Sequence, residues 1–297
     1  MGQINLKGVG VALITPFKED ESVDYKALGR LVEFQIQNNT DYLVVLGTTA
    51  ETPTLTADEQ INIIRTVIEK NKGRIPIILG VGGNNTRALA EKLKNDDFTG
   101  VDGILSVVPY YNKPSQEGIY QHYKTIAAAT SLPIILYNVP GRTGVNMNAQ
   151  TTLRIAAECK NVIAIKEASG DITQMDDIIK NKPKDFEVIS GDDGITFPLI
   201  TLGAIGVISV IGNAFPKEFS KMVRLALAGD FANARTIHHS FTELIELIFI
   251  DGNPAGVKCM LHMMGYVENK LRLPLVPTRI TTYEKIREVL HTLNIKY

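Results

Sequence analysis

The sequence predicts an α/β fold, a (β/α)8 TIM barrel followed by a C-terminal helical appendage. Eight short apolar runs rich in β-branched residues recur at a spacing of roughly 20–35 residues, with amphipathic stretches of helical period between them. The runs are nearly continuous in apolar residues, as parallel strands buried on both faces are. About eight such strand–helix units in roughly 225 residues are typical of a closed barrel.

The expected strands begin close to the N-terminus and continue to about residue 210. In chain order they are Val9–Pro16, Tyr42–Leu46, Ile75–Val81, Gly103–Val108, Ile134–Val139, Val162–Ile165, Phe186–Ser190 and Ile205–Val210. Helices are expected between them, the clearest at Tyr25–Gln37, Ala57–Glu69 and Gln116–Ala129. Asp24, Thr56 and Ser115 stand where N-caps belong, and Thr56 with Glu59 forms a capping-box pattern.

The pattern changes after Val210, where no further strand-like run appears. Three helical stretches follow, at about Phe231–Ile250, Pro254–Met264 and Thr282–Leu293. We therefore expect a catalytic barrel over residues 1–229 and a helical domain over residues 230–297. A doubly wound open sheet is the alternative, but the glycine-rich segments at 8–10 and 80–83 match neither the dinucleotide fingerprint nor the P-loop.

Composition and charge limit the classes of function. The chain has 297 residues, of which 44% are hydrophobic and 21% charged, with a net charge of −1 and no long run of one sign. This balance argues against a nucleic-acid or membrane partner held by bulk electrostatics. Cys159 and Cys259 lack metal or disulfide spacing, and the N-terminus lacks a signal-peptide pattern, so a cytoplasmic location is expected.

Lys166 is the most informative residue, because it stands in the apolar run Val162-Ile163-Ala164-Ile165-Lys166-Glu167-Ala168. A buried lysine is either paired with a carboxylate or neutralised, and a neutral amine is a nucleophile that forms Schiff bases with carbonyl substrates. Alternation places Val162, Ala164 and Lys166 on one face and Glu167 on the other, so Glu167 is a poor partner. The alternative is that the strand has ended and Lys166 emerges into water.

Other polar residues follow the expected strands at the same end, where the active sites of barrel enzymes lie. Taken singly, each has an ordinary explanation as a core tyrosine, a turn threonine or a solvated loop residue. Their common position opposite Lys166 favours a single site. The residues are Thr48 and Thr49 after the second strand, Tyr110 and Tyr111 after the fourth, Tyr137 and Arg142 at the fifth, and Gly191 after the seventh.

These residues, in this order, resemble the dihydrodipicolinate synthase family of the pyruvate-dependent class I aldolase superfamily. The resemblance runs from Thr15-Pro16-Phe17 to the helical tail. Its specific segments are Gly47-Thr48-Thr49-Ala50-Glu51, Pro109-Tyr110-Tyr111-Asn112-Lys113-Pro114, Tyr137-Asn138-Val139-Pro140-Gly141-Arg142-Thr143-Gly144, Ile165-Lys166-Glu167-Ala168 and Ser190-Gly191-Asp192-Asp193.

The resemblance implies a condensation of pyruvate with L-aspartate 4-semialdehyde through a lysine Schiff base. The product is 4-hydroxy-tetrahydrodipicolinate, on the route to diaminopimelate and lysine. Lys166 would form the imine, and Tyr137, Thr48 and Tyr111 would relay protons. No metal or organic cofactor is implied, because the imine is the electron sink.

The resemblance also assigns substrate contacts. Arg142 would clamp the carboxylate of the semialdehyde, and the backbone amides at Thr48 and Thr49 would hold that of pyruvate. Gly191 and Ile208 would line the pocket through their carbonyls.

A homo-oligomer is expected from the same resemblance, a tetramer built as a dimer of dimers, with Tyr111 reaching into a neighbouring subunit. Asn84 and Tyr110 fit the family's inhibitor site for L-lysine. The chain departs from the feedback-sensitive pattern, because Ala57 and Gln60 replace histidines and Ala88 replaces a glutamate. Loss of that carboxylate removes a charge-assisted contact, so we expect weak or no inhibition by lysine.

Two competing functions remain at this point. A sister lyase, such as N-acetylneuraminate lyase or a keto-deoxy sugar acid aldolase, would share the barrel and the lysine, although Thr48 and Arg142 favour the synthase. A catalytically silent barrel that binds keto acids or serves as a scaffold would be expected to have lost Lys166 or a relay residue.

Overall fold

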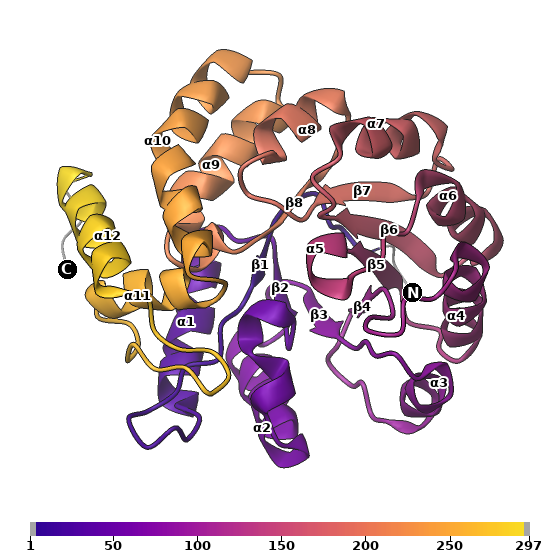
Figure 1. The fold of residues 1–297 in the computed structure, drawn as a ribbon, viewed down its shortest axis with the longest axis horizontal. Helices are drawn as coiled ribbons and strands as arrows, with labels where there is room; N and C mark the ends of the chain where they lie inside the picture. Colours follow the sequence, from indigo (N-terminus) through magenta and orange to yellow (C-terminus); the bar gives the residue numbers. More distant parts are fainter. Residues whose placement is uncertain (1–3, 294–297) are drawn as a thin grey trace.

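The computed structural model describes residues 4–293, and its centre is a closed barrel of eight parallel strands in chain order (Figure 1). The strands are β1 Gly8–Ala12, β2 Tyr42–Val45, β3 Ile77–Gly80, β4 Gly103–Val107, β5 Ile134–Asn138, β6 Val162–Glu167, β7 Glu187–Ser190 and β8 Gly206–Ser209. β8 pairs with β1, which closes the barrel. The expected fold class is confirmed.

Helices follow the strands, and most of them surround the barrel on the outside, as Figure 1 shows. They are α1 Tyr25–Gln37, α2 Ala57–Asn71, α3 Thr86–Asn95, α4 Gln116–Ala128, α5 Pro140–Thr143, α6 Ala149–Glu158, α7 Ile172–Asn181, α8 Thr196–Leu202 and α9 Pro216–Leu227, with short 3-10 turns η1 Thr48–Ala50, η2 Thr52–Thr54 and η3 Ile211–Asn213. The expected N-caps are confirmed: the side chains of Asp24, Thr56 and Ser115 each accept a backbone N–H of the first helical turn.

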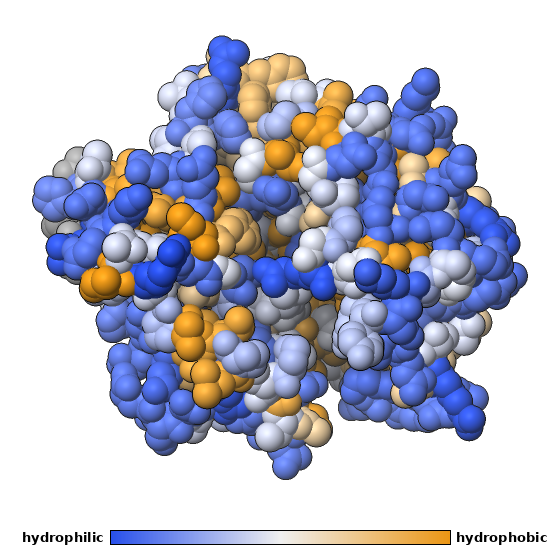
Figure 2. All heavy atoms as spheres, viewed as in Figure 1, coloured by the Kyte–Doolittle hydropathy of each residue, from blue (hydrophilic) through white to orange (hydrophobic). Residues whose placement is uncertain are grey.

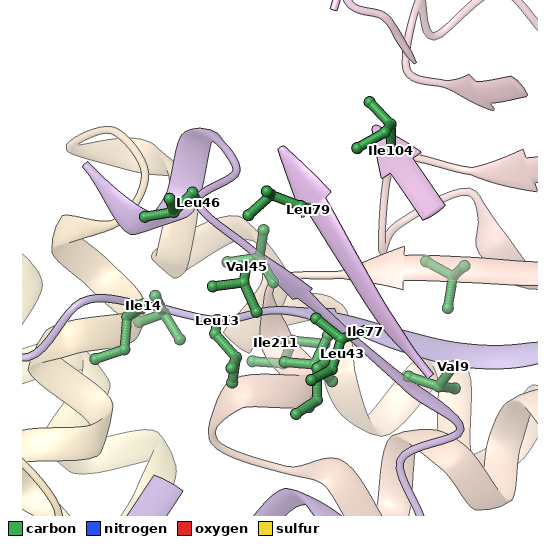
Figure 3. Close-up of a cluster of buried hydrophobic side chains, with 14 of the residues drawn as sticks. Val9, Leu13, Ile14, Leu43, Val45, Leu46, Ile77, Leu79, Ile104 and Ile211 are labelled. Carbon is green, nitrogen blue, oxygen red and sulfur yellow. The ribbon is translucent and has the colours of Figure 1, made fainter. Parts of the chain in front are cut away.

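Side chains that alternate along the strands point into two different apolar cores, one inside the barrel and one outside it. The inner core fills the barrel and draws on every strand, with members such as Tyr42, Ile135 and Ile208. The outer core lies between barrel and helices; Figure 3 shows part of it, with Leu43 of β2 beside Ile77 of β3. Side chains that point inward at the carboxyl ends of the strands therefore converge on one mouth.

The alternation in β6 is broken once. Ile134 pairs with Val162 but Ile135 pairs with Ala164, so an extra residue is inserted at Ile163. Val162 consequently belongs to the outer core, and the prediction that it shares a face with Ala164 and Lys166 is wrong. Ala164 does belong to the inner core, and Lys166 follows two residues later.

The helical appendage follows α9 and consists of α10 Phe231–Ile250, α11 Ala255–Met263 and α12 Ile280–Thr292, which pack against one another. α10 also packs along α9 of the barrel (Figure 1). In Figure 2 much of the surface is hydrophilic, with apolar patches over this appendage. The domain boundary at residue 229 stays a prediction.

No helix between residues 4 and 293 combines the length and the apolar character needed to cross a membrane.

Candidate active site

Lys166 lies within β6, not beyond its end. Its Cα pairs with those of Tyr137 on β5 and Ile189 on β7, and its side chain is 6% exposed. The Nζ atom lies 4.3 Å from the centre of the Tyr137 ring. The interpretation in which the strand has ended and the lysine is solvated is therefore wrong.

The Lys166 ammonium has no carboxylate within ion-pair distance among residues 4–293. Its neighbour Glu167 accepts hydrogen bonds from Asn138 Nδ2 at 3.1 Å, from Gln174 Nε2 at 3.1 Å and from the Ser169 amide at 2.7 Å. Burial raises the pKa of Glu167, and these donors oppose that rise. Glu167 is thus occupied on the far side of the strand, as alternation predicts.

Asn138 links this site to the loop after β5. Its Nδ2 donates to Asn146 Oδ1 at 2.7 Å as well as to Glu167, and its Oδ1 accepts from the Met147 amide at 3.0 Å. The side chain is fully buried. Asn138 therefore braces its loop, and its amide group is fully engaged within the protein.

Gly191 approaches Lys166 closely at the end of β7. A Cβ atom at position 191 would lie 2.7 Å from the Cβ of Ala168 and 3.1 Å from Cε of Lys166. Any larger residue would push against the lysine side chain, so glycine keeps the space beside it open. Ile208 on β8 is 1% exposed and belongs to the same inner core as Tyr137.

Thr48 and Thr49 form the η1 turn after β2. Thr48 is exposed, whereas Thr49 is 2% exposed and its Oγ1 accepts from Asn253 Nδ2 at 2.9 Å. Glu51, which ends the turn, is 1% exposed and bonds with Lys258 Nζ at 2.5 Å. The sequence left the role of Glu51 open; the structure places it in a buried ion pair.

The remaining predicted residues lie in segments that follow the strands at the same end of the barrel. Arg142 is exposed on α5, which lies across the barrel mouth in Figure 1, and Tyr111 is 87% exposed in this single chain. Tyr110 is 41% exposed, and its carbonyl accepts from Asn84 Nδ2 at 3.1 Å. The surface is hollowed over the barrel centre in Figure 2.

A closed barrel that holds a buried lysine without a carboxylate partner beside a tyrosine, at the carboxyl ends of its strands, has the architecture of a Schiff-base aldolase. The model of the dihydrodipicolinate synthetase family matches residues 5–293. The chain belongs to this family.

Known proteins agree with this assignment over the full length. The 4-hydroxy-tetrahydrodipicolinate synthase of Parabacteroides distasonis is 78% identical over 296 residues, which cover 100% of both chains. The crystal structure of dihydrodipicolinate synthase from Aquifex aeolicus superposes with a TM-score of 0.94 at 44% identity, covering 98% of this chain and 99% of that one. A structure described as the first monomeric dihydrodipicolinate synthase variant has a TM-score of 0.94 at 43% identity, with 97% of each chain covered.

Proposed function

We propose that this chain condenses pyruvate with L-aspartate 4-semialdehyde to give 4-hydroxy-tetrahydrodipicolinate through a Schiff base on Lys166. The observation that carries the proposal is the environment of Lys166, which is 6% exposed and faces an aromatic ring, with no carboxylate partner in the described chain. No carboxylate among residues 4–293 binds this amine, and a lysine amine inside a barrel can form a Schiff base with a carbonyl substrate.

The reaction follows from the chemistry of this amine. The Lys166 amine attacks the ketone carbon of pyruvate, and loss of water leaves an imine. The pyruvate methyl group loses a proton to give an enamine, whose carbon attacks the aldehyde. The amine of the semialdehyde then attacks the imine carbon, closes the ring and displaces Lys166. The reaction needs protons to be moved to and from the substrates, and we assign this role to a relay of Tyr137, whose ring faces Lys166, with Thr48 and Tyr111.

Substrate carboxylates would be held by groups around the barrel mouth. The backbone amides of Thr48 and Thr49 would take the carboxylate of pyruvate, and the planar guanidinium of Arg142 that of the semialdehyde. Gly191 and Ile208 would complete the wall beside the lysine.

The exposed Tyr111 ring supports a homo-oligomer, because a second subunit would bring such a ring into a neighbouring site. We propose a tetramer built as a dimer of dimers, working in the cytoplasm, where both buried cysteines stay reduced. Equilibrium sedimentation tests the assembly. The test has to distinguish a tetramer from a monomer, because one similar structure is described as a monomeric variant.

We also propose that L-lysine inhibits weakly or not at all. Asn84 and Tyr110 would remain as an effector site, but Ala57, Gln60 and Ala88 supply no charged side chain there. Strong inhibition at submillimolar lysine would contradict this proposal.

The direct test is a turnover assay with both substrates, following the cyclic product, for the wild type and Lys166→Ala. Turnover that disappears in the variant supports the proposal, and turnover that survives overturns the Schiff-base mechanism. A wild type that gives no product but still traps pyruvate on borohydride reduction would instead be a sister aldolase using another aldehyde. A wild type that traps no pyruvate would be a silent barrel.

A further inference from the structure

The Thr48–Thr49 turn has an unfavourable backbone on both sides. Leu46 and Glu51 both have φ of 55°, in the left-handed region that residues with a Cβ atom rarely adopt. Such residues persist only where the surrounding structure holds them. The structure therefore has to contain contacts that fix this turn, and they come from a distant part of the chain.

The first contact is a hydrogen bond from the appendage. Asn253, just before α11, donates from Nδ2 to Thr49 Oγ1 at 2.9 Å, and its side chain is 6% exposed. The two residues are 204 positions apart in sequence. The turn also receives a bond from the barrel itself, since Thr15 Oγ1 donates to the Ala50 carbonyl at 2.7 Å.

The second contact is an ion pair. Lys258 of α11 donates from Nζ to Glu51 Oε1 at 2.5 Å, and neither side chain is exposed to solvent. Glu51 Oε2 accepts the Arg272 backbone N–H at 3.0 Å, and Lys258 also donates to the Lys270 carbonyl at 2.9 Å. Both oxygens of the carboxylate accept a hydrogen bond, and the ammonium bridges the turn and the loop that follows α11.

We infer that Asn253 and Lys258 are positioning residues for the pyruvate carboxylate, because they hold the Thr48–Thr49 turn from behind in the conformation that presents its backbone amides. The inference rests on the proposed function, in which those amides bind the carboxylate. Backbone amides on a turn bind an anion well only when the positions of the N–H groups are held within about 0.5 Å. The appendage is then a working part of the keto-acid site and not only a cover for the barrel.

The test compares Asn253→Ala and Lys258→Met with a control in the same appendage. Arg279→Gln removes the bond from Arg279 Nε to Asp251 Oδ1 at 2.6 Å, which ties α12 to the end of α10 without touching the turn. We expect the KM for pyruvate to rise about tenfold in Asn253→Ala and Lys258→Met, as loss of one buried polar contact predicts. In the same assays the KM for the semialdehyde should stay within about twofold, and Arg279→Gln should change neither constant by more.

A purely structural role would give a different result. It would lower the thermal midpoint and the active fraction while the folded enzyme kept its KM for pyruvate, and that outcome in Asn253→Ala overturns the inference. Asn253→Ala decides alone if Lys258→Met fails to fold, because it removes only a neutral hydrogen bond. A wild type that forms no borohydride-stable adduct with pyruvate overturns the proposed function as well. A normal adduct with unchanged KM values in the variants overturns this inference alone.

Discussion

Two buried lysines of this chain both face an aromatic ring, but only one of them is paired with a carboxylate among residues 4–293. Lys166 is 6% exposed with its Nζ 4.3 Å from the Tyr137 ring centre, and Lys258 is 0% exposed with its Nζ 4.2 Å from that of Phe17. Lys258 is paired with the Glu51 carboxylate, whereas Lys166 has no such partner among residues 4–293.

The difference supports the roles that we propose for the two lysines, Lys258 in the fold and Lys166 as the nucleophile. Burial lowers the pKa of Lys258 to about 8 and Glu51 opposes that shift, while the Lys258 Nζ is held by the Glu51 carboxylate and the Lys270 carbonyl. No carboxylate among residues 4–293 lies within ion-pair distance of the Lys166 Nζ, which is why we propose this amine for imine formation. The missing carboxylate, more than burial or the aromatic ring, distinguishes Lys166 from Lys258.

The largest expected effect comes from changing Lys166 while keeping its charge. Lys166→Arg leaves a cation beside Tyr137 but cannot form an imine, so turnover should fall by roughly 10⁴–10⁶-fold, as for other lost nucleophiles. Initial rates with saturating substrates measure this. A variant that kept a tenth of the wild-type rate would show that charge, not nucleophilicity, is what the site needs.

The second effect tests the paired lysine. Glu51→Gln leaves the Lys258 ammonium buried without a counter-ion and should lower the free energy of unfolding by about 3–5 kcal/mol. The double variant Glu51→Gln with Lys258→Met should recover most of that loss in urea denaturation. As a matched control, Lys92→Ala breaks the exposed pair with Asp96 and should cost less than about 1 kcal/mol. If Glu51→Gln alone were as stable as the wild type, the ion pair would not stabilise the fold.

Asp193 is the acidic counterpart of Lys166. It is a buried carboxylate that has no cation within ion-pair distance among residues 4–293. Its Oδ2 accepts the amides of Val210 at 3.0 Å and Ile211 at 2.9 Å, and burial raises its pKa to about 6. The folded state then binds a proton that the unfolded state releases between about pH 4 and 6, so stability falls by about 3 kcal/mol as pH rises through this window and is level above it. Urea denaturation from pH 4 to 7 should show this fall in the wild type but not in Asp193→Asn. Parallel profiles would contradict it.

Tyr137→Phe keeps the ring that faces Lys166 and removes its hydroxyl. The ring packing is kept and the proposed proton carrier is lost, so turnover should fall about 100-fold while pyruvate is still trapped on the lysine. Stopped assays with and without borohydride distinguish the two steps. Loss of trapping together with turnover would assign the hydroxyl to imine formation itself.

The smallest effect comes from the other ring. Phe17→Leu removes the aromatic face near Lys258 but keeps the ion pair, so the free energy of unfolding should fall by about 1–2 kcal/mol. Turnover should stay within about twofold, because the turn is still held. Thermal unfolding and the standard assay check both. A large loss of turnover would mean that the Phe17 ring shapes the site directly.

The sequence predicted the barrel because hydrophobic period and strand spacing are local signals. Lys166 could be predicted as a site residue for the same reason, because a charged residue within an apolar strand is also a local signal. Lys258 carries a comparable signal in Ala255-Gly256-Val257-Lys258-Cys259, yet its meaning depends on Glu51, which is 207 positions away. The inserted residue at Ile163 likewise depends on pairing with β5, which no local pattern contains.

The most direct measurement is to trap pyruvate with borohydride and locate the modified lysine by peptide mass spectrometry. We expect a reduced pyruvate adduct on Lys166 and none on Lys258, although both lysines are buried beside aromatic rings. An adduct on Lys258, or an active enzyme in which Lys166 stays unmodified, would contradict it.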